Sequence, residues 1–159
     1  NLTANEVNLI EKIVPFVLDG FIVRNHDEIL KGAGVTFDML LELQNLGILS
    51  GVGSILEVTF RSVDKERYIK TIGDHGRGLL IENDNPNQTL KLGVYSVTTL
   101  GKQVIKLGKF ALDEKYLVAV GKQIQKSQFK VSVIDYEPQG NDMLRIFNNK
   151  EIPNDERGA

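Results

Sequence analysis

The fold of this chain is decided by the stretch LLELQNLGIL, residues 40–49. Thr36, just before it, can cap a helix with its hydroxyl oxygen, and Asp38 places a negative charge in the first turn, where the helix dipole favours it. Four apolar side chains then share one helical face: Phe37, Leu40, Leu41 and Leu46. Gly47 suits the left-handed position that ends many helices. The stretch therefore predicts a helix that stops at glycine and leads into a strand.

Another helix is predicted at the start of the chain. The run Thr3-Ala4-Asn5-Glu6 has the spacing of a capping box, in which the hydroxyl and the carboxylate each accept a free backbone N–H. The helical stripe that follows consists of Val7, Ile10, Val14 and Val17. Pro15 lies inside this stripe and should bend or shorten the helix, because proline has no backbone N–H to donate.

Residues 48–97 change to the pattern of β-strands. Apolar runs at residues 55–60, 68–72, 79–81 and 90–97 are separated by clusters of Gly, Asp and Asn. Helical spacing returns twice, after Thr98 and after Asp113. The apolar residues at this spacing are Val97, Leu100, Val104 and Leu107 in the first helix, and Leu117, Val120 and Ile124 in the second. With a further alternating strand at 129–133, the pattern predicts an α+β fold with an antiparallel sheet.

Two segments together resemble a winged-helix domain. One is residues 40–49, and the other is YSVTTLGKQV, residues 95–104. The second resembles the exit from the wing into the last helix of many bacterial regulators, where a strand ends, Thr caps the next helix and Gly lets that helix pack closely. The whole run is also similar to a bacterial family of unknown function. The resemblance implies a winged-helix-like helical core with an enlarged antiparallel sheet and an additional helix–strand unit.

Two features depart from the winged-helix pattern. About 45 residues separate Leu49 from Tyr95, enough for two extra strands, where the family has a short hairpin. Residues 36–60 hold three acids and no Lys or Arg, so a DNA-reading helix at this position would repel phosphates.

We expect a single domain over residues 1–137, followed by a polar tail at 138–159 that is ordered at most over residues 143–147.

Composition excludes several chemistries. The 159 residues include no cysteine, so the chain has no disulfide, no thiolate nucleophile and no cysteine metal ligand. Only His26 and His75 could join carboxylates around a metal, at no diagnostic spacing, and we expect neither metal nor cofactor. The longest apolar stretch, residues 13–23, is interrupted and too short to cross a membrane. With no signal peptide visible we expect a cytoplasmic location, and the start at Asn1 suggests a piece of a larger protein.

Positive charge is concentrated in one block of the chain. Residues 98–130 hold seven Lys and two acids, a net charge of +5, while the segments on either side are net negative. Five lysines of this block fall on helical faces: Lys102, Lys106, Lys115, Lys122 and Lys126. They could form a patch for nucleic acid or an acidic partner. Alternatively, they are the solvated outer faces of amphipathic helices, with their stems covering apolar edges.

The most unusual local run is the glycine-rich segment at residues 73–78. Its candidate anion-binding residues are Gly73, Asp74, His75, Gly76 and Arg77. Backbone amides and an Arg can cradle an anion, but the run lacks the Gly-Lys-Ser/Thr end of a phosphate loop and lies between strands. The alternative is a hairpin turn. Asp74 and His75 are adjacent, and neighbours on a strand point to opposite faces, which disfavours a catalytic pair.

The sequence favours a non-enzymatic function. We predict no catalytic residue, because the chain has no nucleophile elbow and no arrangement of acid, base and nucleophile at a useful spacing. We expect a module that binds a protein partner or packs on another part of its own, larger bacterial chain. The alternative is a nucleic-acid-binding regulator of winged-helix type that uses the lysine-rich face, and an enzyme is the least favoured class.

Overall fold

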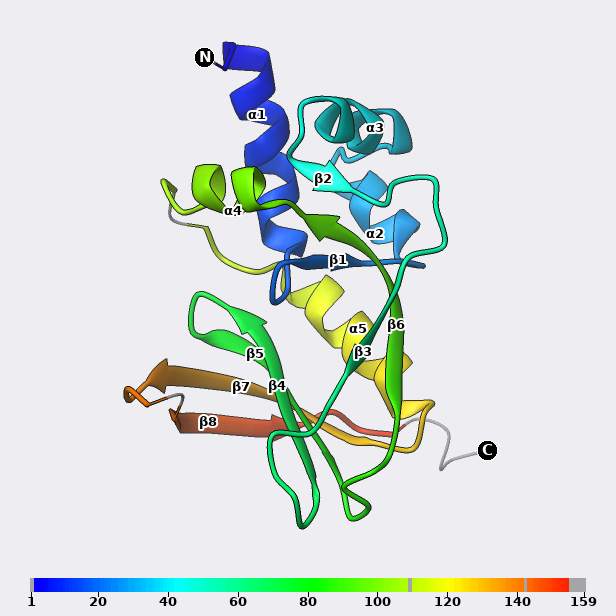
Figure 1. The fold of residues 1–159 in the computed structure, drawn as a ribbon, viewed down its shortest axis with the longest axis vertical. Helices are drawn as coiled ribbons and strands as arrows, with labels where there is room; N and C mark the ends of the chain where they lie inside the picture. Colours follow the sequence, from blue (N-terminus) through cyan, green and yellow to red (C-terminus); the bar gives the residue numbers. More distant parts are fainter. Residues whose placement is uncertain (1, 109, 142, 155–159) are drawn as a thin grey trace. The chain divides into compact units, whose positions relative to one another are not determined.

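The computed structural model describes residues 2–108, 110–141 and 143–154 (Figure 1). Its helices and antiparallel strands form an α+β fold, which confirms the predicted class. The chain divides into two compact units, the first from Asn1–Val58 and Leu92–Tyr116, the second from Thr59–Lys91 and Leu117–Ala159. This division differs from the single domain over residues 1–137 that we expected from the sequence.

The first unit combines helices with a small sheet. Its helices are α1 (Ala4–Ile13), the 3-10 turn η1 (Val14–Phe16), α2 (Asp27–Gly32), α3 (Phe37–Asn45) and α4 (Thr99–Ile105). Its sheet has the order β1-β6-β2, built from β1 (Phe21–Val23), β6 (Leu90–Val97) and β2 (Leu49–Ser50). A further strand, β3 (Glu57–Phe60), also pairs with β6, and both of these strands continue into the second unit.

The helix starts agree with the sequence predictions. Thr3 and Glu6 form the capping box, with N–H···O distances of 3.0 and 3.1 Å. Thr36 and Thr98 cap α3 and α4 by accepting N–H groups three residues on. Pro15 shortens the first helix as expected, since α1 ends at Ile13 and the proline lies in the 3-10 turn. These signals are local, so the sequence alone carries them.

Three of the predicted helix faces are partly wrong. In the first stripe Ile10, Val14 and Val17 are buried, whereas Val7 is 41% exposed. On α3 the fully buried residue is Leu43, whereas Phe37, which we placed in the core, is 50% exposed.

On α4 the buried residues are Gly101 and Ile105, whereas Leu100 of the predicted apolar face is exposed; Leu107, which we included in this helix, lies beyond its end and is also exposed. The physical reason is close packing at Gly101, where a Cβ would lie only 2.4 Å from the Ile48 carbonyl oxygen. The helix therefore makes its closest approach at its glycine, while Leu100 stays exposed.

The second unit is a four-stranded antiparallel sheet with a helix. The order is β4-β5-β7-β8, from β4 (Tyr68–Asp74), β5 (Arg77–Asn83), β7 (Lys130–Pro138) and β8 (Leu144–Glu151). Helix α5 (Glu114–Gln125) begins in the first unit and ends in the second. It packs closely at Gly121, where a Cβ would lie 2.3 Å from Ile152 Cδ1 and 3.3 Å from Val131 Cγ1. The predicted core residues Leu117, Val120 and Ile124 are fully buried.

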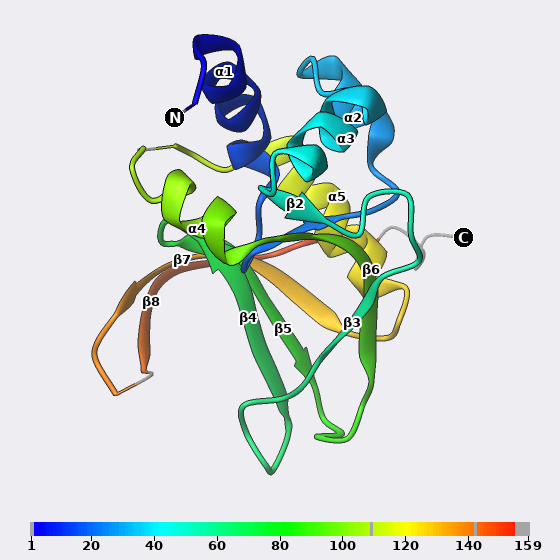
Figure 2. The ribbon, with the colours of Figure 1, turned by 45° about the horizontal axis from the view of Figure 1, so that its top comes forward.

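Strand β8 lies in the segment that we expected to be a polar tail. All of it except Phe147 pairs with β7, and Ile152, directly after it, is buried. Figure 2 shows β7 and β8 as neighbouring ribbons. The register shifts between Asp135 and Tyr136, which face Asn148 and Ile146, so Phe147 is an extra residue in β8. This is a β-bulge, which bends and twists a strand locally.

Candidate interaction surfaces

A run of exposed apolar side chains lies at the start of β8. Four neighbouring side chains keep a large exposed fraction: Met143 (66%), Leu144 (41%), Ile146 (38%) and Phe147 (50%). Arg145 lies among them, with Nε 2.7 Å from Glu137 Oε1 and its guanidinium 5.4 Å from the centre of the Phe147 ring. We call residues 143–147 the apolar edge. From the sequence we predicted only that these residues could be ordered.

The position of β8 in the sheet adds a second property. It is the last strand in the order β4-β5-β7-β8, so its outer backbone groups pair with no strand among the described residues. An edge strand presents alternating N–H and C=O groups that another extended chain can pair in series. Every residue of β8 is also exposed, so side chains on both faces of the strand are accessible to solvent.

The outward face of α3 is acidic. Asp38 and Glu42 are exposed together with Phe37 and Asn45, and the helix contains no Lys or Arg. Negative charge at this position opposes contact with a phosphate backbone. The acidic residues that the sequence places in this helix are therefore on its exposed face. Phe37, which we predicted on the apolar face, is exposed beside them.

The predicted lysine-rich face is divided between the two units. Lys102, Lys106 and Lys115 belong to the first unit, and Lys122 and Lys126 to the second. All five side chains are exposed, and Lys115 and Lys122 lie seven residues apart on α5, which places them on one side of that helix. The aliphatic stem of Lys102 covers Gly20, where a Cβ would lie 2.8 Å from Cε. A common surface for nucleic acid stays a prediction.

The glycine-rich run forms a two-residue hairpin turn between β4 and β5. Asp74 pairs with Arg77, and the residues between them, His75 and Gly76, have φ of 52° and 77°. The His75 N–H donates to the Asp74 carboxylate at 2.9 Å, and Arg77 donates to Asp135 Oδ1 at 2.9 Å. A Cβ on Gly73 would lie 2.5 Å from the Arg77 carbonyl oxygen, so glycine is needed there for close packing.

These bonds occupy the groups that an anion would need. The Arg77 charge is balanced by Asp135, which also accepts from Asn148 Nδ2 at 2.8 Å. The hydrogen bond from Asn148 and the bond from Arg77 hold the pKa of the Asp135 carboxyl below its usual range. The geometry is that of the hairpin turn left open in the sequence analysis, and anion binding at this run stays a prediction.

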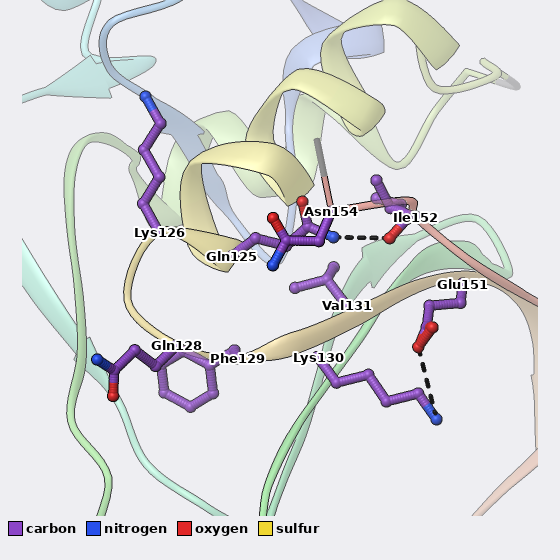
Figure 3. Close-up of a pocket in the computed structure, with 9 residues that line it drawn as sticks. All are labelled: Gln125, Lys126, Gln128, Phe129, Lys130, Val131, Glu151, Ile152 and Asn154. Atoms are coloured by element: carbon purple, nitrogen blue, oxygen red, sulfur yellow. Dashed lines mark hydrogen bonds and ion pairs between the residues drawn. The ribbon is translucent and has the colours of Figure 1, made fainter. Parts of the chain in front are cut away.

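One pocket, of about 460 Å³, lies where α5 ends and β7 begins (Figure 3). Gln125 Nε2 donates to the Ile152 carbonyl oxygen at 2.7 Å, and Lys130 lies 4.0 Å from Glu151. Both of these charged side chains are more than half exposed, so water screens the pair. The pocket walls carry no pair of groups suited to acid–base chemistry among the residues that Figure 3 draws.

A second pocket, of about 810 Å³, lies between two loops of the second unit. Residues 59–65 form one wall and residues 86–91 the other. Three cations line it, Arg61, Lys65 and Lys91, against one described acid, Asp64. Sequence analysis missed this cluster because its members lie up to 30 residues apart and meet only when the two loops fold together.

Groups with shifted pKa values lie outside both pockets. Burial raises the pKa of Tyr68 to about 12 and raises the pKa values of Tyr95 and Tyr116 as well. Within the described ranges, no group of three His, Asp or Glu residues could hold a metal ion. No described helix is long and apolar enough to cross a membrane.

Comparison of the sequence and the structure with protein-family models, curated proteins and solved structures finds no match.

Proposed function

We propose that this chain is a non-enzymatic protein-interaction module of a larger, cytoplasmic bacterial protein, and that its partner adds an extended segment to β8. The observation that carries the proposal is the apolar edge, four exposed apolar side chains within residues 143–147. Single exposed apolar residues are ordinary on protein surfaces, whereas four of them within five residues at the start of an edge strand favour an interaction site.

The chemistry of β8 selects the kind of partner. Its outer backbone groups call for an extended chain, because only a strand can pair them in series. Leu144 and Ile146 lie two residues apart and therefore on one face, where they recognise apolar side chains at alternate positions of the partner. The expected partner segment is thus extended, with apolar residues at every second position. It belongs to another protein or to another part of the same chain.

The proposal is tested by selecting binding peptides from a random 12-residue library. We expect enriched peptides with alternating apolar residues and affinities in the micromolar range. Ile146→Ser should weaken their binding about tenfold or more, because the removed side chain is part of the contact. The control is Phe37→Ser, which removes an exposed apolar side chain from α3 (50% exposed, against 38% for Ile146) and should leave the affinity unchanged.

Backbone methylation of a selected peptide separates strand pairing from simple apolar adhesion. N-methyl groups on alternate residues should abolish binding when they lie on the edge facing β8 and spare it when they lie on the other edge. Equal sensitivity of both edges, or binding that ignores Ile146→Ser, contradicts the proposal.

A second candidate is nucleic-acid binding by a winged-helix module. It is supported by the pairing of β2 with β6, which brings the end of the α3 segment beside the strand that leads into α4. The acidic face of α3 argues against major-groove contact, so the candidate depends on the lysines. Changing Lys102, Lys106, Lys122 and Lys126 to Glu should abolish salt-sensitive gel shifts of duplex DNA or RNA. No shift of the unchanged protein at low salt rejects this candidate.

A further inference from the structure

We propose that the pocket between residues 59–65 and 86–91 binds a ligand that carries several phosphate groups. Arg61, Lys65 and Lys91 line this pocket, and all three side chains are exposed. None of them has an ion pair or hydrogen bond to the described residues. Gathered like charges raise the local positive potential, which favours a polyvalent anion over a single charge.

The other described arginines of the second unit form ion pairs with carboxylates. Arg67 pairs with Glu82 at 3.0 Å, Arg77 with Asp135 at 2.9 Å and Arg145 with Glu137 at 2.7 Å. Arg61 is the described arginine of this unit that lacks such a partner. Among the described arginines of this unit, the one without a protein counter-charge therefore lies at the pocket, together with Lys65 and Lys91.

The first wall of the pocket is held in place by its own hydrogen bonds. Ser62 Oγ accepts the N–H groups of Asp64 and Ile69 at 3.1 and 3.0 Å, and it lies 2.7 Å from the Asp64 carbonyl oxygen. The Asp64 carboxylate accepts the N–H groups of Glu66 and Arg67, both at 3.1 Å. Asp64, the only acid among the described lining residues, therefore binds backbone N–H groups of its own loop.

Two Asx turns over residues 83–87 lead into the second wall. Asn83 accepts the Asn85 N–H at 2.8 Å, and Asn85 accepts the Asn87 N–H at 2.9 Å. Gln88 Nε2 then donates to the Ser127 carbonyl oxygen at 3.1 Å, which ties the loop to the end of α5. Loops fixed before binding lose little conformational entropy when a ligand arrives.

The lining decides the class of ligand. Cationic groups bind phosphate oxygens by charge-assisted hydrogen bonds, and Thr59, Thr89 and Asn87 can add neutral ones. The one aromatic residue of the lining, Phe60, is 5% exposed and offers no ring face for stacking a base. Recognition therefore rests on the phosphate groups, and the volume of about 810 Å³ lies within the range for small-molecule sites.

The test is calorimetric titration of the whole chain with inorganic tripolyphosphate. We expect saturable 1:1 binding that Arg61→Gln with Lys91→Gln weakens by about tenfold or more. The matched control is Lys12→Gln with Lys31→Gln, which removes the same charge from exposed positions of the first unit and should change the affinity less than about twofold. Urea unfolding of each variant shows that it is folded, and a raised Tm in the presence of tripolyphosphate gives a second reading of binding.

A second titration, with a 12-nucleotide single-stranded DNA, identifies the source of the phosphates. Binding of tripolyphosphate with weak binding of DNA assigns a small polyphosphorylated ligand. Stronger binding of DNA, lost in the same double variant, assigns a nucleic-acid chain to the same pocket. The proposal is overturned if tripolyphosphate does not bind, or if the control variant loses as much affinity as the pocket variant.

Discussion

Tyr116 joins the start of α5 to β1 through one hydroxyl group. The hydroxyl accepts the Val23 N–H at 2.8 Å, and the ring meets Phe16 edge to face with centroids 5.3 Å apart. The side chain is fully buried. Asp113, after which we predicted this helix, accepts the Tyr116 N–H three residues on at 2.9 Å. The sequence could not predict the role of the tyrosine hydroxyl, whose partner lies 93 residues away.

The buried tyrosines predict a loss of stability at high pH. Burial raises the pKa of Tyr68 to about 12 and that of Tyr116 still further, so both stay neutral in the folded state while the unfolded chain ionises near pH 10. Their stabilising contribution is complete below pH 10 and is lost as pH rises through the folded pKa. Each should reduce the free energy of unfolding by about 1.4 kcal/mol per pH unit above pH 10. Urea titrations at pH 8, 10 and 11 measure this slope.

Tyr68→Phe separates the pH effect from a general loss of stability. The change removes the 2.6 Å hydrogen bond to the Phe60 carbonyl oxygen, so stability at pH 8 should fall by about 1–3 kcal/mol, while the slope above pH 10 becomes shallower. Ile72→Val, in the same sheet, should lower stability by about 0.5–1.5 kcal/mol at every pH and keep the slope. An unchanged slope in Tyr68→Phe would mean that this tyrosine titrates equally in both states.

At the scale of elements, glycine decides how α4 meets the sheet. Gly101→Ala would place a Cβ 2.4 Å from the Ile48 carbonyl oxygen and 2.8 Å from Val97 Cγ1. Backbone on one side cannot move as a flexible side chain can, so we expect a loss of about 1–3 kcal/mol, despite the better helix propensity of alanine. Urea unfolding measures the change.

Gly32→Ala in α2 is the matched substitution. No atom lies within 4 Å of the added Cβ, and the residue lacks the positive φ that disfavours alanine. Stability should therefore rise by about 0.4–1 kcal/mol. If both substitutions shift stability equally, close packing at Gly101 is not what orients α4.

Elements marked by local sequence patterns were predicted correctly, whereas features that depend on tertiary packing were not. Strands β4, β5 and β6 were predicted because apolar residues and turn clusters are local signals. The second half of β8 was missed because Asn148, Asn149, Lys150 and Glu151 are polar and exposed on both faces, so no alternation marks them. The buried faces of α3 and α4 were misjudged because the partners of Leu43 and Gly101 are chosen by tertiary packing.

At the scale of the whole molecule, the chain passes between its two units three times, at residues 58, 91 and 116. Each unit is therefore assembled from two separate segments, which no composition shift in the sequence marks. The same holds for the candidate sites. The lysines were visible as a block, whereas the pocket between residues 59–65 and 86–91 forms only where two separate segments meet. The position of the apolar edge depends on the pairing of β8 with β7.

The segment Thr59–Lys91 should be removable from the first unit. The Val94 N–H donates to the Leu56 carbonyl oxygen at 3.0 Å, so the chain ends at Val58 and Leu92 lie on neighbouring strands. A chain of residues 1–58, an Asn-Gly turn and residues 92–121 should fold, because that dipeptide suits a two-residue hairpin. Cooperative urea unfolding and dispersed amide resonances are the expected results. A chain without cooperative unfolding would show that the first unit depends on the second.

The extra residue in β8 limits what can grow from that edge. A regular edge strand is a template for identical strands, and repeated addition of this kind leads to fibrils. With Phe147 inserted, the strand is regular on each side of the bulge but out of step across it. A second copy of β8 cannot follow the whole edge in one register. Deleting Phe147 would restore a single register and turn a protected edge into a seed for aggregation.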